Sequence, residues 1–194
     1  MKVKKCIILA IVISHLSSLT LSVFAETSGS TTADITFESG TLTLAEMSSF
    51  SFGTHTISPV LQTYPALETS VFLGVRDLRG TGEGWKVTAL ASRFNPGANP
   101  TLPGTSISLI NGTAVSTQLA GNEPTVVQNI RMDCDGIASV NIASAAINTG
   151  LGVWTIEWNG NAGGNTNATL NVPGGIATVG THTTTITWTL ADAP

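Results

Sequence analysis

The feature that most constrains this fold is a strict alternation of side chains near the C-terminus. His182, Thr184, Ile186, Trp188 and Leu190 occupy every second position, and each position between them is threonine. A period of two places one set of side chains on a core and the other toward water, as in a half-buried antiparallel strand. An amphipathic helix needs a period near 3.6, so the pattern predicts a strand.

The same period recurs along most of the chain. Apolar and polar side chains alternate at residues 85–89, 106–109 and 154–158, and residues that favour strands and turns dominate throughout. We expect further strands at residues 35–37, 41–44, 50–57, 71–75, 125–130, 138–143 and 168–172. So many short strands predict an all-β fold: a single antiparallel β-sandwich, with a barrel-like arrangement as the alternative.

Turn residues punctuate these strands. Asn111-Gly112 predicts a tight hairpin, because both central positions of such a turn require positive φ. Pro-Gly pairs at residues 96–97, 103–104 and 173–174 break the chain elsewhere. Residues 26–33 are rich in serine and threonine and predict a short flexible leader, so we expect one β domain over residues 34–194.

The N-terminus has the pattern of a secretory signal peptide. Lys2, Lys4 and Lys5 precede a mostly apolar stretch, and small residues stand at the positions before Ala25 that a signal peptidase reads. An uncleaved membrane anchor is the alternative, but the small-residue site favours cleavage after Ala25. We therefore expect export and a mature chain without a membrane span.

The mature chain would be acidic and nearly free of cysteine. Its basic residues are Arg76, Arg79, Lys86, Arg93 and Arg131, against 12 acidic residues in the sequence. This balance argues against partners such as nucleic acid and anionic lipid. Cys134 alone remains after cleavage, so the domain is expected to be stable without a disulfide.

Few residues suit catalysis or metal binding. His55 and His182 are the two histidines of the mature chain, too few for a structural metal site, and Gly-x-Ser-x-Gly is absent. Residues 133–136, Asp-Cys-Asp-Gly, predict a turn, and the aspartates beside Cys134 predict a poorly reactive thiol. We expect a protein that is not an enzyme and needs no cofactor.

Charged residues concentrate in one glycine-rich segment. Arg76, Asp77, Arg79, Glu83 and Lys86 flank the glycines at positions 80, 82 and 84. In one interpretation, an Asp77–Arg79 ion pair fixes a turn and the following Trp85 lies in the core. In the other, Arg79 is free to bind carboxylate or carbonyl groups of a ligand. The first interpretation is the commoner outcome for such a pair.

These motifs, in this order, resemble the WxL domain of Gram-positive surface proteins. Asp77-Leu78-Arg79-Gly80 leads to Gly84-Trp85-Lys86-Val87, a Gly-Leu-Gly-Val-Trp stretch covers 150–154, and the Thr-rich strand ends in Trp188-Thr189-Leu190 with Pro194 as last residue. The first motif departs from the family pattern in having Val87 instead of leucine. The resemblance implies non-covalent attachment to the cell wall with peptidoglycan as ligand, and other surface proteins as partners. The candidate ligand-binding residues are Asp77, Arg79, Trp85, Lys86, Trp188 and Leu190.

Three functions compete at this point. A peptidoglycan-binding module would stack aromatic rings on sugars and bond sugar hydroxyls through threonine and asparagine. A structural subunit of a surface complex would instead use an exposed sheet edge, and its wall attachment would come through partner proteins. A wall hydrolase needs paired carboxylates in a cleft, and the sequence offers only local pairs such as Asp133 and Asp135. We favour the first function.

Overall fold

The computed structural model describes residues 27–95, 99–116, 121–161 and 164–192. The chain divides into residues 1–37 and residues 38–194. In the first part, residues 27–37 form neither helix nor strand and are exposed to solvent. The predicted signal peptide, residues 1–25, lies outside the described residues. All the strands lie in the second part.

Twelve strands form three antiparallel four-stranded sheets in the described part of the chain. The first sheet has the order β1 (Leu42–Met47), β3 (Ser70–Asp77), β10 (Gly152–Asn159) and β6 (Thr113–Val115). The second sheet has the order β2 (Gln62–Ala66), β11 (Asn165–Val172), β5 (Ser106–Ile110) and β8 (Asn129–Asp133). The third sheet has the order β12 (Ile186–Asp192), β4 (Trp85–Ala91), β9 (Val140–Ala145) and β7 (Thr125–Val126).

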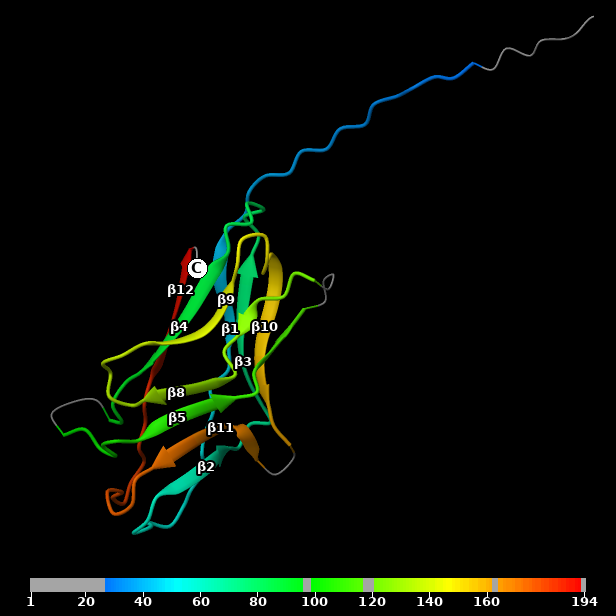
Figure 1. The fold of residues 1–194 in the computed structure, drawn as a ribbon. Coiled ribbons are helices and arrows are strands. Elements are labelled where there is room, and N and C mark those ends of the chain that lie inside the picture. Colours follow the sequence, from blue (N-terminus) through cyan, green and yellow to red (C-terminus); the bar gives the residue numbers. More distant parts are fainter. Residues whose placement is uncertain (1–26, 96–98, 117–120, 162–163, 193–194) are drawn as a thin grey trace, which may run out of the picture. The chain divides into compact units, whose positions relative to one another are not determined.

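This architecture confirms the predicted all-β antiparallel sandwich. The sheets are open at both ends of their strand order, so the barrel-like alternative is not adopted. The strands of the second sheet run across the direction of β3 and β10 (Figure 1). The described ranges contain no helix long and apolar enough to cross a membrane.

Buried side chains from all three sheets form one hydrophobic core. In β4, every second residue from Trp85 to Ala91 is buried and the residues between are half-buried, as the period of two predicted. Trp85 and Trp158 are the largest fully buried side chains. Removing such aromatic surface from water stabilises a fold by roughly 25 cal/mol per Å², so these two residues anchor the core.

Two predicted strands are wrong, and two strands, β2 and β6, were not predicted. Residues 35–37 and 50–57 form no strand in the structure. In the second stretch, Phe50 and Phe52 pack edge to face against each other instead, with ring centroids 5.7 Å apart. Strand β2 contains Pro65, which argues against a strand by sequence; the proline is tolerated because β2 is an edge strand.

The predicted Asn111-Gly112 hairpin is also wrong. Asn111 has the expected positive φ of 56°, but β5 and β6 on its two sides belong to different sheets. The chain turns a corner here and passes from the second sheet to the first. A Cβ on Gly112 would lie 2.7 Å from Nε1 of Trp158, so close packing explains the glycine better than turn geometry does. Residues 125–130 likewise split between β7 and β8 in different sheets.

Strand β12 begins later and lies nearer the surface than its sequence predicts. Regular pairing with β4 starts at Ile186, although Ser92 and Asn95 still donate backbone hydrogen bonds to Thr185 and Thr183. Trp188 and Leu190 face inward, but the prediction that they are buried is wrong, because both are half-buried. An edge strand covers its side chains from one side only, and β12 is an edge strand.

Candidate functional site

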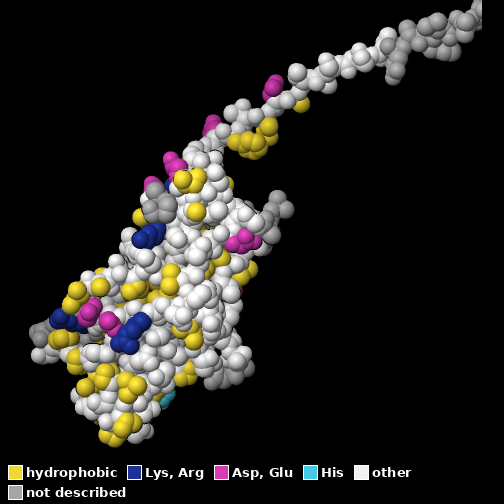
Figure 2. Space-filling view, in the orientation of Figure 1, with side chains coloured by type: hydrophobic (Ala, Val, Ile, Leu, Met, Phe, Trp, Pro, Cys, Tyr) yellow, Lys and Arg dark blue, Asp and Glu magenta, His cyan; other side chains and the backbone are white. Residues whose placement is uncertain are grey.

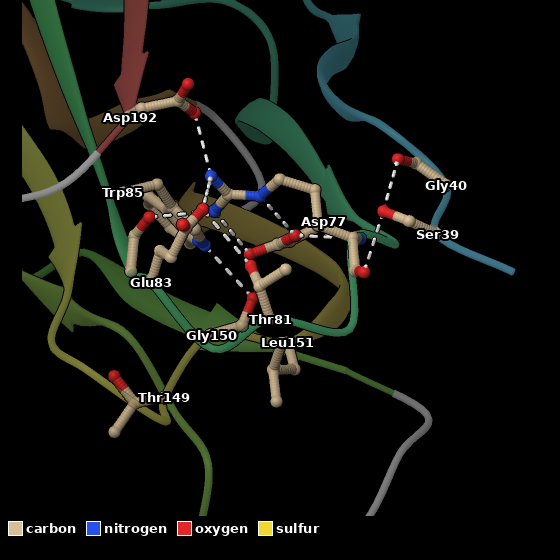
Figure 3. A network of polar contacts seen from close by, with 12 residues as sticks. Ser39, Gly40, Asp77, Thr81, Glu83, Trp85, Thr149, Gly150, Leu151 and Asp192 are labelled. Carbon is tan, nitrogen blue, oxygen red and sulfur yellow. Dashed lines mark hydrogen bonds and ion pairs between the residues drawn. The ribbon is translucent and has the colours of Figure 1, made fainter. Parts of the chain in front are cut away.

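The charged segment forms an ion-pair network around Arg79, in the loop that joins β3 to β4 (Figure 3). Arg79 Nε donates to Asp77 Oδ1 at 3.0 Å, and Nη2 lies 2.9 Å from Asp77 Oδ2. Nη1 donates to Asp192 Oδ1 at 2.8 Å and lies 3.4 Å from Glu83 Oε2. Nη2 also donates to the carbonyl oxygen of Gly84 at 2.8 Å. One guanidinium therefore joins the ends of three strands.

The ion pair at the centre of this network is largely buried. The side chain of Asp77 has no exposed surface, and that of Arg79 is 11% exposed. Hydrogen bonding from Arg79 lowers the pKa of Asp77 despite the opposing effect of burial, and Asp77 in turn raises the pKa of Arg79. A buried carboxylate needs such a partner to stay charged. The donors of Arg79 are occupied, so the geometry favours a structural role over ligand binding.

The loop glycines have different roles. Gly80, Gly82 and Gly84 all adopt positive φ, between 69° and 80°. A Cβ on Gly84 would overlap the backbone oxygen of Ala145, whereas a Cβ on Gly80 would meet nothing within 4 Å. Gly84 is therefore required by close packing as well as by backbone conformation.

Trp85 and Trp154 are fixed by one turn between β9 and β10. Trp85 Nε1 donates to the Gly150 carbonyl at 3.0 Å, and Trp154 Nε1 donates to the Leu151 carbonyl at 2.9 Å. Trp85 has no exposed surface, and Trp154 is 2% exposed. The indole of Trp85 is therefore buried in the core, and its one polar atom is bonded to the backbone of Gly150.

The outer face of the third sheet carries mostly hydroxyl and amide side chains. Register places Lys86 opposite Ala191 and Ser144, and Thr88 opposite Thr189 and Asn141, with these side chains pointing away from the core. Thr187 and Thr189 are exposed, and Lys86 is half-buried. We call this surface the hydroxyl face; its polar residues are Lys86, Thr88, Thr125, Asn141, Ser144, Thr187 and Thr189, and the apolar Leu90 and Ala191 lie on the same face, opposite Thr187 and Lys86.

An open groove separates β12 from β1. Its volume is about 480 Å³, and it is lined by Leu42, Thr43, Leu44, Trp188, Thr189, Leu190 and Asp192. Trp188 stacks on the buried Trp158, with centroids 6.3 Å apart and planes at 25°. The β1–β12 groove thus exposes part of the core between two edge strands. Asp192, which accepts a hydrogen bond from Arg79, also lines this groove.

Cys134 lies in the predicted turn after β8 and is buried. Burial raises the pKa of its thiol to about 11, assisted by the charges of Asp133 and Asp135. A thiol with this pKa is protonated at neutral pH and is a poor nucleophile. Within the described residues, no three His, Cys, Asp or Glu side chains are placed to hold a metal ion.

The sequence predicted most members of the Arg79 network but not all of them. Asp77, Arg79 and Glu83 stood out as a local cluster of charges. Asp192 lies 113 residues from Arg79 in the chain and could be found only from the pairing of β12 with β4. The β1–β12 groove was equally hidden, because nothing local marks β1 and β12 as neighbours.

Residues 26–194 match the family model described as WxL domain surface cell wall-binding. Neither the curated proteins nor the solved structures contain a match to the chain.

Proposed function

The chain belongs to the WxL domain family of surface cell-wall-binding proteins, and on this premise we propose that it attaches non-covalently to the wall by binding peptidoglycan directly. The observation that carries the proposal is the hydroxyl face of the third sheet. Its threonine, serine and asparagine side chains offer both donors and acceptors. Sugar hydroxyls and the amides of wall peptides need this mixture, so the face suits the polymer chemically.

Electrostatic attraction contributes little to the proposed binding at the hydroxyl face. Charged side chains occur as isolated spots on the surface seen in Figure 2, and most of the surface is uncharged. Lys86 is the single cation of the hydroxyl face. Exposed charges act over about 8–10 Å in physiological salt, and an acidic chain gains no attraction toward anionic wall polymers. Binding would therefore depend on many short-range hydrogen bonds and persist as salt rises.

Trp188 and Leu190 remain candidates for contact through the groove, since both line it. Asp77 and Arg79 act indirectly in this account, because their polar groups bind each other and Asp192. We place them as residues that position β12, and with it the threonines of the hydroxyl face. The protein acts as a binding module without catalysis.

A structural subunit of a surface complex is the second candidate. It is favoured by the free edges of β1 and β12, which have one paired neighbour each. Unpaired backbone groups at an edge can pair with a strand of another protein. In this account a partner, not this chain, would touch the wall.

Sedimentation with insoluble peptidoglycan separates the two accounts. The chain from Glu26 would be mixed with purified wall free of protein, and bound chain would be measured in the pellet. We expect direct pelleting, and we expect the double variant Thr187→Val and Thr189→Val to lose most of it. Valine keeps the shape of threonine and removes the hydroxyl groups.

Thr166→Val is the matched control, because Thr166 is an exposed threonine on the second sheet. It should pellet like the wild type. A folded wild-type chain that stays in the supernatant unless another surface protein is added would overturn direct binding. Equal loss in the control variant would remove the hydroxyl face from the proposal.

A further inference from the structure

The β1–β12 groove combines half-buried apolar side chains with exposed polar ones. The apolar residues are Leu42, Leu44, Trp188 and Leu190, and the polar residues are Thr43, Thr189 and Asp192. Its volume of about 480 Å³ falls within the range of small-ligand sites, roughly 300–1,000 Å³. Such sites pair an apolar lining with a few placed polar groups. The groove therefore has the composition of a site for a ligand that is apolar on one face and polar at its edges.

The width of the groove excludes a polypeptide strand paired to both of its edges. Paired strands lie about 4.7–4.9 Å apart, so a strand between β1 and β12 would hold them about 9–10 Å from each other. Cα atoms of β1 and β12 instead approach within 8 Å. A ligand must therefore lie along the open mouth of the groove, against its side chains, and a single ring suits this shape better than a peptide strand.

Trp188 is the aromatic side chain of this groove. It stacks on the fully buried Trp158, which holds its indole in a fixed orientation. Trp188 is half-buried, whereas Trp85, Trp154 and Trp158 are at most 2% exposed. The faces of a sugar ring carry C–H groups, and these pack favourably on the electron-rich face of an aromatic ring. Trp188 is therefore the tryptophan that a sugar can reach.

Asp192 gives the same groove an oriented hydrogen-bond acceptor. Arg79 Nη1 donates to Asp192 Oδ1 at 2.8 Å, and the second carboxylate oxygen points away from Arg79 (Figure 3). That second oxygen accepts no hydrogen bond from the residues that the structure describes, and the side chain is 78% exposed. A ligand hydroxyl can donate to it in a charge-assisted bond, which is stronger than a bond between neutral groups. Arg79 then acts as a positioning residue.

The charge around Asp192 favours a sugar over a carboxylate of the wall peptide. Arg79 is shared among three carboxylates, those of Asp77, Glu83 and Asp192, so the network carries excess negative charge. Exposed charges act over about 8–10 Å in physiological salt, and a ligand carboxylate in the groove would be repelled. An uncharged sugar meets no such repulsion and brings hydroxyl groups that donate.

We infer that the β1–β12 groove binds the glycan of peptidoglycan, with one sugar ring packed against Trp188 and one of its hydroxyl groups donating to the second carboxylate oxygen of Asp192. The inference rests on the proposed function, since it names the part of the polymer that the chain recognises. Thr189 belongs to both the groove and the hydroxyl face. A glycan bound in the groove can therefore continue onto that face.

Acrylamide quenching of tryptophan fluorescence tests the contact in the unmodified chain from Glu26. Because the other three tryptophans are buried, acrylamide quenches mainly Trp188. A peptide-free oligosaccharide of N-acetylglucosamine should shield Trp188 and lower the quenching as its concentration rises. Free stem peptide of the wall, added at the same concentrations, should leave the quenching unchanged.

Asp192→Asn tests the acceptor, and Glu83→Gln is the matched control. Both carboxylates pair with Arg79, but Glu83 does not line the groove. Asp192→Asn should weaken oligosaccharide binding about tenfold, as expected for the loss of a hydrogen bond to a charged group. Glu83→Gln should bind as the wild type does. Equal affinities in the two variants would overturn the role of Asp192.

The same preparation of insoluble wall separates this inference from the proposed function. If the chain pellets with wall but the oligosaccharide does not shield Trp188, the inference is wrong and direct binding stands. Shielding by the stem peptide alone also overturns the inference. A folded chain that neither pellets nor responds to the oligosaccharide contradicts both.

Discussion

Arg79 joins the ends of β3, β4 and β12 from a single position in the loop between β3 and β4. Its guanidinium binds the carboxylates of Asp77 and Asp192 and the carbonyl of Gly84. Arginine suits this role because its planar fork makes several charge-assisted hydrogen bonds at once. The sequence predicted the Asp77–Arg79 pair, since the two residues are close in the chain. It could not predict Asp192, whose position depends on the strand order of the third sheet.

We expect Arg79→Ala to lower the free energy of unfolding by about 3 kcal/mol, because it leaves the buried Asp77 carboxylate without a positively charged partner and with only the backbone N–H of residue 79 as donor. Arg131→Ala is the matched control: Arg131 pairs with Asp133 at the same spacing, but both side chains are more than half exposed. That change should cost about 0–1 kcal/mol. Denaturant unfolding of both variants measures the difference. Equal losses in the two variants would contradict the structural role of Arg79.

Asp77→Asn should remove a pH-dependent part of the stability. The folded-state pKa of Asp77 is lowered from 3.8, so the carboxylate contributes fully above that value, and its contribution is lost as pH falls through the folded pKa. The melting temperature of the variant should therefore lie well below that of wild type at pH 7, and the gap should narrow below about pH 4. A gap of constant size from pH 7 to pH 2 would show that the carboxylate charge is not what stabilises the loop.

At the scale of elements, local alternation predicted strands well and their partners poorly. The alternation around Trp85 and Trp154 identified β4 and β10, because their buried side chains repeat at every second residue. The hairpin predicted at Asn111-Gly112 was wrong: Asn111 has a turn conformation, but the chain passes from one sheet to another there. The half-burial of Trp188 was not predicted, because the alternation of a strand is the same at the edge and at the centre of a sheet.

Two glycines in the loop between β3 and β4 allow the cost of a steric overlap to be separated from the cost of a positive φ. Gly84→Ala and Gly80→Ala both place an alanine at positive φ, of 80° and 72° respectively. Only the first also forces a Cβ into the Ala145 carbonyl. We expect Gly80→Ala to cost roughly 1 kcal/mol and Gly84→Ala to cost several times as much or prevent folding. Thermal unfolding compares them, and similar melting temperatures would mean that β9 moves easily to make room.

At the scale of the whole molecule, the hydroxyl face and the β1–β12 groove are two surfaces of different chemistry. The hydroxyl face, through which we propose that the chain binds the wall, carries short polar side chains, and the β1–β12 groove is lined mainly by apolar ones. The Arg79 network holds β12, which contributes to both.

The most direct test of wall binding is a titration of the isotope-labelled chain from Glu26 with soluble peptidoglycan fragments, followed by NMR. We predict that backbone amide shifts change with concentration at Thr88, Asn141, Thr187 and Thr189 and leave the second sheet unchanged. Repeating the titration at higher salt should preserve these changes, because short-range hydrogen bonds dominate. A folded chain whose spectrum does not respond to the fragments, or responds only on the second sheet, would contradict direct binding through the hydroxyl face.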